Sequence, residues 1–167
     1  AINKLLKDKT SKIDAVISKC CNNYGPFQFP EKLMPLIVIN ALKGEKLPVY
    51  GDGTNVRDWL YVEDHADALL TILEHASPGQ SYNIGCNNEI SNIDLVKKIC
   101  AILNQIKPRE FSYESLITFV TDRPGHDYRY AIDPTRLNSE LNWNPSYSFE
   151  ESLKKTKKWY VDNQDWW

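Results

Sequence analysis

The spacing of hydrophobic positions along the chain changes repeatedly between two periods. Apolar residues that recur every three or four positions form one stripe on a helix, and runs rich in β-branched and aromatic residues favour strands. On this basis we predict helices over 1–9, 30–43, 63–75, 93–106, 133–141 and 149–163. Strands are predicted over 13–20, 47–50, 56–62, 81–85 and 116–121.

Short signals set the limits of several of these elements. Gly44 is a suitable stop for the second helix, because glycine tolerates the left-handed conformation that ends many helices. Pro48 cannot donate a backbone hydrogen bond, so the strand over 47–50 is expected at a sheet edge. Two N-terminal capping boxes are predicted, Ser91–Asp94 and Ser148–Glu151.

The predicted order of helices and strands is irregular, with no internal repeat and no linker. It indicates an α/β fold in which some strands belong to a sheet that is completed elsewhere. We expect the leucine-rich stripe of the helix over 63–75 to face the core through Leu69, Leu70, Ile72 and Leu73.

Composition and charge exclude several classes of function. The chain has 167 residues, of which 42% are hydrophobic and 25% charged, as in an ordinary globular domain. A net charge of −2 gives no electrostatic case for a nucleic acid or a membrane surface as partner. The longest apolar runs are too short to cross a membrane, and the first residues show no signal-peptide pattern, so a cytoplasmic location is expected.

The four cysteines show neither a C-x-x-C pair nor a histidine at metal-ligand spacing. Cys20 and Cys21 are adjacent at the end of an apolar run, so we expect two reduced side chains on opposite faces of a strand. We therefore expect no structural disulfide and no metal site.

Polar residues follow the first predicted strand at its carboxyl end. Asn22, Asn23, Tyr24 and Gly25 form a polar lip with two amides and an aromatic hydroxyl. In open α/β sheets, ligands bind beyond the carboxyl ends of strands, which favours a ligand site here. An Asx-type turn that only ends the strand explains the same residues equally well.

Two arginines are candidate ligands for an anion. Arg57 interrupts an aromatic strand, and Arg123 belongs to the loop Asp122–Asp127, which follows a predicted strand and also contains His126. A planar guanidinium suits phosphate oxygens. The alternatives are a solvated turn with local Asp–Arg pairs, and a surface pair between Arg57 and Asp58.

Three blocks of the sequence resemble the dTDP-glucose 4,6-dehydratases, which belong to the extended short-chain dehydrogenase/reductase family. The blocks are Asn22–Leu33, Arg57–His65 and Asp122–Asp133, and Tyr82–Gly85 accompanies them. The middle block is widespread among sugar-nucleotide enzymes, whereas the other two are narrower. The resemblance covers nearly all of the chain. It implies the C-terminal, substrate-binding part of an NAD(P)-binding Rossmann-like fold over 1–167, with residues 1–26 contributing the last core elements and the N-terminal dinucleotide-binding part missing.

The resemblance also implies a role for each matching residue. Asn22 would contact the sugar nucleotide and Asn23 would contact NAD. Lys32 and Leu33 would line the nucleotide site, Pro48, Val49 and Tyr50 would brace the thymidine, and Arg57 and Arg123 would hold the diphosphate. The remaining residues of the implied pocket are Asn92, Asp122, Pro124, Gly125 and His126.

The implied reaction converts dTDP-glucose to dTDP-4-keto-6-deoxyglucose in deoxysugar (rhamnose-type) biosynthesis. NAD oxidises C4, water is lost across C5–C6, and the hydride returns to C6. The sequence contains no G-x-G-x-x-G turn, no Tyr-x-x-x-Lys pair and no Thr-Asp-Glu segment, so no catalytic residue is assigned in this chain. We therefore expect a substrate-binding part of a lyase that is inactive alone.

Other functions remain open from the sequence. One is a non-catalytic nucleotide-sugar-binding module or one half of a split enzyme. Another is an interaction protein that binds no nucleotide and pairs through a sheet edge. A third is part of a related sugar-nucleotide epimerase or dehydratase. The apolar stripe Ile2, Leu5 and Leu6 also predicts a homodimer, or association with a complementary N-terminal half.

Overall fold

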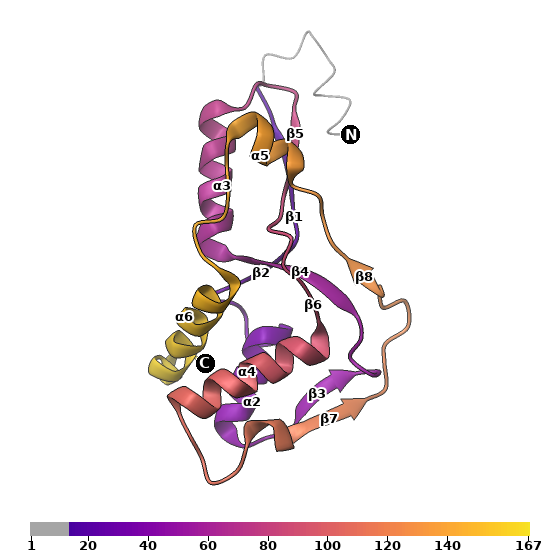
Figure 1. Ribbon diagram of the computed structural model, residues 1–167, viewed down its shortest axis with the longest axis vertical. Coiled ribbons are helices and arrows are strands. Elements are labelled where there is room, and N and C mark those ends of the chain that lie inside the picture. The colour runs from indigo at the N-terminus through magenta and orange to yellow at the C-terminus, as the bar shows by residue number, and fades with distance from the viewer. Residues whose placement is uncertain (1–13) are drawn as a thin grey trace.

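The computed structural model describes residues 14–167, so the helix predicted over 1–9 lies outside the described residues. The described chain forms two lobes joined by a central set of strands (Figure 1). The first is called here the β1–β5 lobe, after its two paired strands. It contains β1 (Ile17–Cys20), α3 (Val62–His75), β5 (Ser81–Ile84) and α5 (Thr135–Leu141). β1 and β5 pair in parallel.

The second lobe, called here the β3–β7 lobe, is mainly helical (Figure 1). It contains α2 (Leu33–Lys43), β3 (Leu47–Tyr50), α4 (Asn92–Ile106), the 3-10 turn η1 (Tyr113–Leu116), β7 (Ile117–Val120), α6 (Phe149–Asp162) and the 3-10 turn η2 (Gln164–Trp166). β3 pairs in parallel with β7 and, within 14–167, with no other strand, in agreement with the predicted edge position of Pro48.

β4 (Val56–Tyr61) is the strand on which the two lobes meet. It pairs in parallel with β2 (Asn22–Tyr24) and β8 (Arg129–Tyr130), and antiparallel with β6 (Glu89–Ser91). Successive side chains of a strand point to opposite faces. Accordingly, Leu60 packs into the core of the β1–β5 lobe, whereas Trp59 and Tyr61 pack into the core of the β3–β7 lobe.

The first predicted strand differs from the observed chain path. Residues 22–24 form the separate strand β2 on β4, where the sequence predicted only a polar lip or a turn. Cys21 lies between the two strands, so the expected placement of Cys20 and Cys21 in one strand was wrong. All four cysteines are free thiols. The short strands β6 and β8 were also not predicted, because two or three residues carry no measurable period.

α2 begins three residues later than predicted. Residues 29–32 form a turn in which the Lys32 N–H donates to the Phe29 carbonyl at 3.1 Å, and the helix starts at Leu33. Pro35 falls in the first helical turn, where its missing N–H removes no helical hydrogen bond. Gly44 ends the helix in the left-handed conformation, φ 76°, as predicted.

The predicted core face of α3 was wrong. Ile72 is buried together with Ala68, but Leu69, Leu70 and Leu73 are 41%, 56% and 80% exposed. The helix packs its Ala68–Ile72 line against the neighbouring elements, and among the described residues nothing covers the leucines. Hydrophobic spacing identified the helix correctly but could not tell which side has a partner.

Both predicted caps lie at helix starts, but only one is a complete capping box. Ser148 and Glu151 form both reciprocal bonds at the start of α6. Ser91 accepts the Asp94 N–H at 3.1 Å, but the Asp94 carboxylate bonds the Ser91 hydroxyl at 2.6 Å instead of the backbone. An aspartate is one methylene shorter than glutamate, which explains the difference. Within the described residues, no helix is both long and apolar enough to span a membrane.

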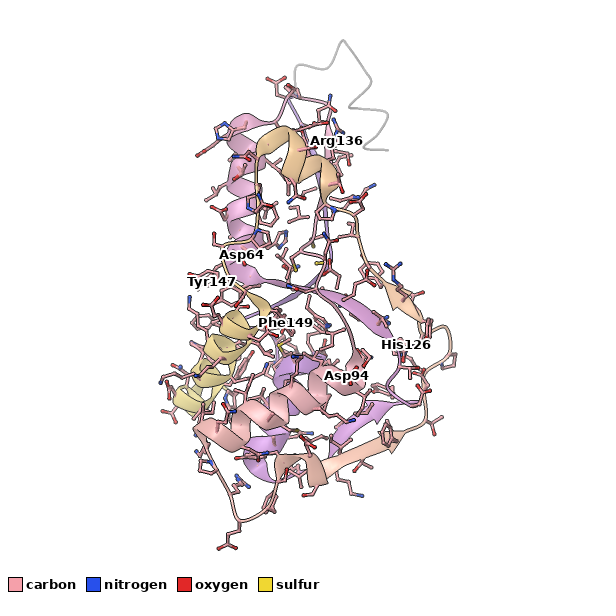
Figure 2. All side chains as sticks on the ribbon, viewed as in Figure 1. Asp64, Asp94, His126, Arg136, Tyr147 and Phe149 are labelled. Carbon is pink, nitrogen blue, oxygen red and sulfur yellow. The ribbon has the colours of Figure 1, made fainter. Side chains whose placement is uncertain are left out.

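The turn before α6 is fixed by an aspartate at the start of α3. The Asp64 carboxylate accepts the Ser146 N–H at 2.8 Å, next to Tyr147 and Phe149 (Figure 2). Burial raises the pKa of Asp64, although hydrogen bonds from the backbone of Ser146 and Tyr147 act in the opposite direction. The contact ties the segment before α6 to the first turn of α3, directly after β4.

Candidate functional site

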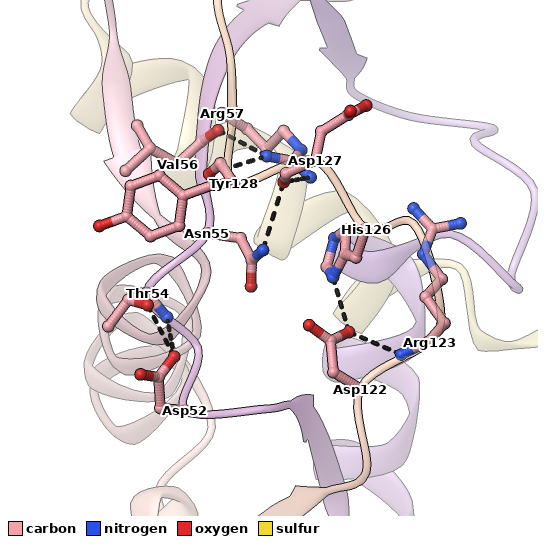
Figure 3. A network of polar contacts seen from close by, with 10 residues as sticks. All are labelled: Asp52, Thr54, Asn55, Val56, Arg57, Asp122, Arg123, His126, Asp127 and Tyr128. Carbon is pink, nitrogen blue, oxygen red and sulfur yellow. Dashed lines mark hydrogen bonds and ion pairs between the residues drawn. The ribbon is translucent and has the colours of Figure 1, made fainter.

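Arg57 is the buried cation of the site. It lies on β4, is 8% exposed, and forms no ion pair with any residue of 14–167. Its guanidinium donates to three backbone carbonyls, those of Val56 at 2.7 Å, Asp127 at 2.7 Å and Tyr128 at 3.4 Å (Figure 3). Carbonyl groups carry no net charge, so the positive charge of the arginine remains uncompensated.

The loop that follows β7 brings a second arginine to the same place. The Asp122 carboxylate lies between two groups of its own loop: it accepts the Arg123 N–H at 2.8 Å and contacts Nδ1 of His126 at 2.7 Å (Figure 3). The hydrogen bond from His126 lowers the pKa of Asp122, so the carboxylate is charged at neutral pH. This arrangement leaves the Arg123 side chain without a hydrogen-bond or ion-pair partner among the described residues.

These elements surround a cavity of about 340 Å³. The side chains of His126 and Tyr50 form one edge, with their rings perpendicular and their centroids 6.4 Å apart. Nine of the thirteen predicted substrate-binding residues line the cavity: Asn22, Lys32, Leu33, Pro48, Tyr50, Arg57, Asn92, Arg123 and His126. They come from β2, the turn before α2, the start of α2, β3, β4, α4 and the loop after β7, several of which are far apart in the sequence.

The other four predicted substrate-binding residues lie outside the lining. Val49 is 1% exposed and belongs to the core, since it alternates with Pro48 and Tyr50 along β3. Asp122 does not line the cavity itself, but its carboxylate is hydrogen-bonded to His126, which does. Pro124 and Gly125 are exposed at the tip of the loop, where Gly125 adopts φ 68°.

Three lining residues were not predicted: Glu31, Leu36 and Trp59. Glu31 pairs with Lys32 at 3.0 Å on the exposed rim. Trp59 could have been found from the sequence, because it lies two residues after Arg57 and therefore on the same face of β4. It was not predicted because a large apolar ring in a strand is typical of a core position.

Asp58 does not pair with Arg57, so the alternative of a surface ion pair was wrong. The two residues point to opposite faces of β4, and Asp58 is fully buried. Its carboxylate accepts the Asn88 N–H at 2.8 Å and the Cys86 N–H at 3.4 Å. Burial raises the pKa of the Cys86 thiol to about 12 and that of Cys21 still further, so neither is a thiolate nucleophile at neutral pH.

Comparison with known proteins identifies the chain's relatives. The family model described as GDP-mannose 4,6 dehydratase matches residues 7–156. A probable dTDP-glucose 4,6-dehydratase of Sinorhizobium fredii is 54% identical over 159 residues, which are 95% of this chain and 45% of that protein. The chain thus spans about half the length of the curated relatives that it matches.

Solved structures agree with this assignment. The dTDP-glucose 4,6-dehydratase of Bacillus anthracis in complex with NAD superposes with a TM-score of 0.86 at 47% identity, over 98% of this chain and 50% of that one. A dTDP-glucose 4,6-dehydratase double mutant from Streptomyces venezuelae, also with NAD bound, gives a TM-score of 0.90 at 38% identity, over 99% of this chain and 48% of that one. The chain therefore belongs to the GDP-mannose 4,6 dehydratase family and has the fold of about half of a dTDP-glucose 4,6-dehydratase.

Proposed function

We propose that the chain supplies the sugar-nucleotide-binding part of a dTDP-glucose 4,6-dehydratase, the lyase that converts dTDP-glucose to dTDP-4-keto-6-deoxyglucose. One observation carries the proposal: Arg57 is buried at the cavity wall with an uncompensated charge. A buried cation without a counter-ion is costly, and an anion that enters the cavity removes this cost. Arg123 from the opposite loop supplies a second positive charge at the same cavity.

A nucleoside diphosphate matches the arrangement of the other lining groups. The diphosphate lies between Arg57 and Arg123, and the guanidinium of Arg57 still has N–H groups for it after three backbone bonds. Pro48 and the exposed ring of Tyr50 give an apolar platform for the base. Lys32, which pairs with Glu31, adds a positive charge at the exposed rim.

NAD contributes the hydride acceptor for oxidation of the sugar at C4 when the complete enzyme binds it. Asn23 is the residue of this chain that fits the cofactor, because its Oδ1 is buried without a hydrogen-bond partner among the described residues. Its Nδ2 donates to the Cys21 carbonyl at 3.1 Å, which fixes the orientation of the amide. Asn23 would therefore accept a hydrogen bond from the cofactor on the face of β2 opposite to that of Asn22.

Calorimetric titration of the purified chain with dTDP tests the proposal. We expect dTDP to bind, UDP to bind more weakly, and Arg57→Ala or Arg123→Ala to lower the dTDP affinity at least tenfold, because a hydrogen bond to a charged group contributes about 1.5–3 kcal/mol. Arg136→Ala is the matched control. Arg136 pairs with Glu140 at 2.8 Å in the other lobe, so its loss should leave the dTDP affinity unchanged.

The same titration separates the proposal from its alternatives. A folded chain that binds no dTDP would contradict the proposal and favour an interaction role. We expect no turnover of dTDP-glucose by the chain with NAD alone, since no described residue is assigned to base or hydride-transfer chemistry. Binding without turnover is also the behaviour of a non-catalytic nucleotide-sugar module, and restored turnover on addition of an N-terminal half of a relative would favour the enzyme.

A further inference from the structure

Trp59 has an unused hydrogen-bond donor beside the cavity. Its side chain lines the cavity and is 4% exposed, and its indole Nε1–H has no partner among residues 14–167. Other tryptophans satisfy this group: Nε1 of Trp143 donates to Asp67 at 2.9 Å, and Nε1 of Trp167 donates to the Tyr160 carbonyl at 3.2 Å. A buried N–H without an acceptor costs about 1–3 kcal/mol, so a partner is expected.

An unused acceptor lies next to this donor. Asn22 is directly opposite Trp59 in the β2–β4 register, so the two side chains project from the same face of the sheet, with Cβ atoms about 5 Å apart. Oδ1 of Asn22 is buried and also has no partner among the described residues. The indole and the amide do not bond each other, although both line the cavity.

The chemistry of this pair selects a hydroxyl group. An indole nitrogen only donates, and an amide oxygen only accepts. A phosphate oxygen would satisfy Trp59 but leave Asn22 without a donor, whereas one hydroxyl accepts from the first and donates to the second. Trp59 also lies two residues beyond Arg57, about 6.6 Å along β4 and farther from the turn that joins Tyr50, at the end of β3, to β4. If the base lies on Tyr50 and the diphosphate on Arg57, this side of the diphosphate is where we expect the hexose.

We propose that Trp59 and Asn22 together bind one hydroxyl group of the hexose, so that Trp59 positions the sugar in the cavity. This inference rests on the proposed function, because it takes the ligand to be a dTDP-hexose. It assigns to a residue of the apolar core a role in distinguishing the sugar from the nucleoside diphosphate.

Two ligands that differ only in the hexose test the inference. The chain is titrated with dTDP-glucose and with dTDP, unchanged and as Trp59→Phe, which keeps a ring but removes the N–H. We expect Trp59→Phe to lower the affinity for dTDP-glucose about three- to tenfold, the range for one neutral hydrogen bond, and to leave the affinity for dTDP unchanged. Trp143→Phe is the matched control: it removes an equally buried indole and its hydrogen bond, and should change neither affinity.

A second variant keeps the test decisive if Trp59→Phe lowers stability. Asn22→Ala should lower the affinity for dTDP-glucose by a similar factor and leave the affinity for dTDP unchanged. The double variant should bind dTDP-glucose only slightly more weakly than either single variant, because both side chains bind the same hydroxyl. Equal weakening of both ligands would overturn the inference in favour of a diphosphate contact.

Unchanged affinities in the variants would also overturn it, and would place the acceptor of the N–H in the small void that Trp59 borders on its other side, near Tyr24 and Ser152. A failure of the proposed function itself looks different. In that case the unchanged chain binds neither dTDP nor dTDP-glucose.

Discussion

Replacement of Asp58 by alanine is expected to lower the free energy of unfolding by about 3 kcal/mol. The Asp58 carboxylate is fully buried and is the acceptor for the N–H groups of Asn88 and Cys86. Removal of the carboxylate leaves two half-buried backbone donors without acceptors and opens a small cavity. The loss of these hydrogen bonds and the new cavity both destabilise the folded state.

Thermal denaturation measures the effect. For a domain of this size, a loss of about 3 kcal/mol lowers Tm by roughly 6–12 °C. Asp52→Ala is the control: Asp52 is exposed and accepts from the Thr54 N–H at 3.0 Å, so its replacement should change Tm far less. An Asp58→Ala chain as stable as the unchanged one would show that the strand β4 does not depend on this carboxylate.

Replacement of Lys157 by methionine is expected to have an effect of similar size and opposite sign. Lys157 lies on α6, is completely buried, and its Nζ has no hydrogen-bond partner among the described residues. Burial lowers the pKa of this amine well below its usual value, because the charged form loses its hydration in the folded protein. Methionine has a similar length and no polar group, and should raise the free energy of unfolding by about 3 kcal/mol.

The pH dependence of unfolding identifies the amine as the cause. Between the lowered pKa of folded Lys157 and about pH 10.4, the pKa of an unfolded lysine, the unfolded chain binds a proton that the folded chain does not. The Lys157 contribution therefore makes stability rise with pH in this window, by up to about 1.4 kcal/mol per pH unit. Lys157→Met should remove that slope, whereas Lys154→Met, at an exposed position of the same helix, should not. A slope that persists in Lys157→Met would contradict the assignment.

Local signals predicted several features of this fold correctly. Gly44 and the Ser148–Glu151 capping box act within one helical turn, so their effect depends little on the rest of the chain. The exposed leucines of α3 and the buried Asp58 were mispredicted for the opposite reason. Which face of an element is covered depends on segments far away in the sequence, and neither hydrophobic spacing nor neighbouring charges contain that information.

The candidate site shows the same division. The apolar and aromatic run around Arg57 and the turn at Arg123 made both residues candidates from chemistry, each beside a structural alternative, and the structure brings them to one cavity. The roles expected for Lys32 and Pro48 came only from the family resemblance, because nothing in their local pattern separates a ligand contact from an ordinary turn or strand. The unused donor of Trp59 becomes visible only when its neighbours in space are known.

The alternation of side chains along β4 has a consequence for how the molecule opens. Leu60 is packed in one core while Trp59 and Tyr61 are packed in the other, so neither lobe can come apart without disturbing the strand they share. The two lobes should then behave as a single cooperative unit, with one calorimetric transition in place of two. Amide protons of β1, which contributes no residue to the cavity lining, should exchange more slowly when dTDP is bound, because the ligand would suppress the common opening reaction.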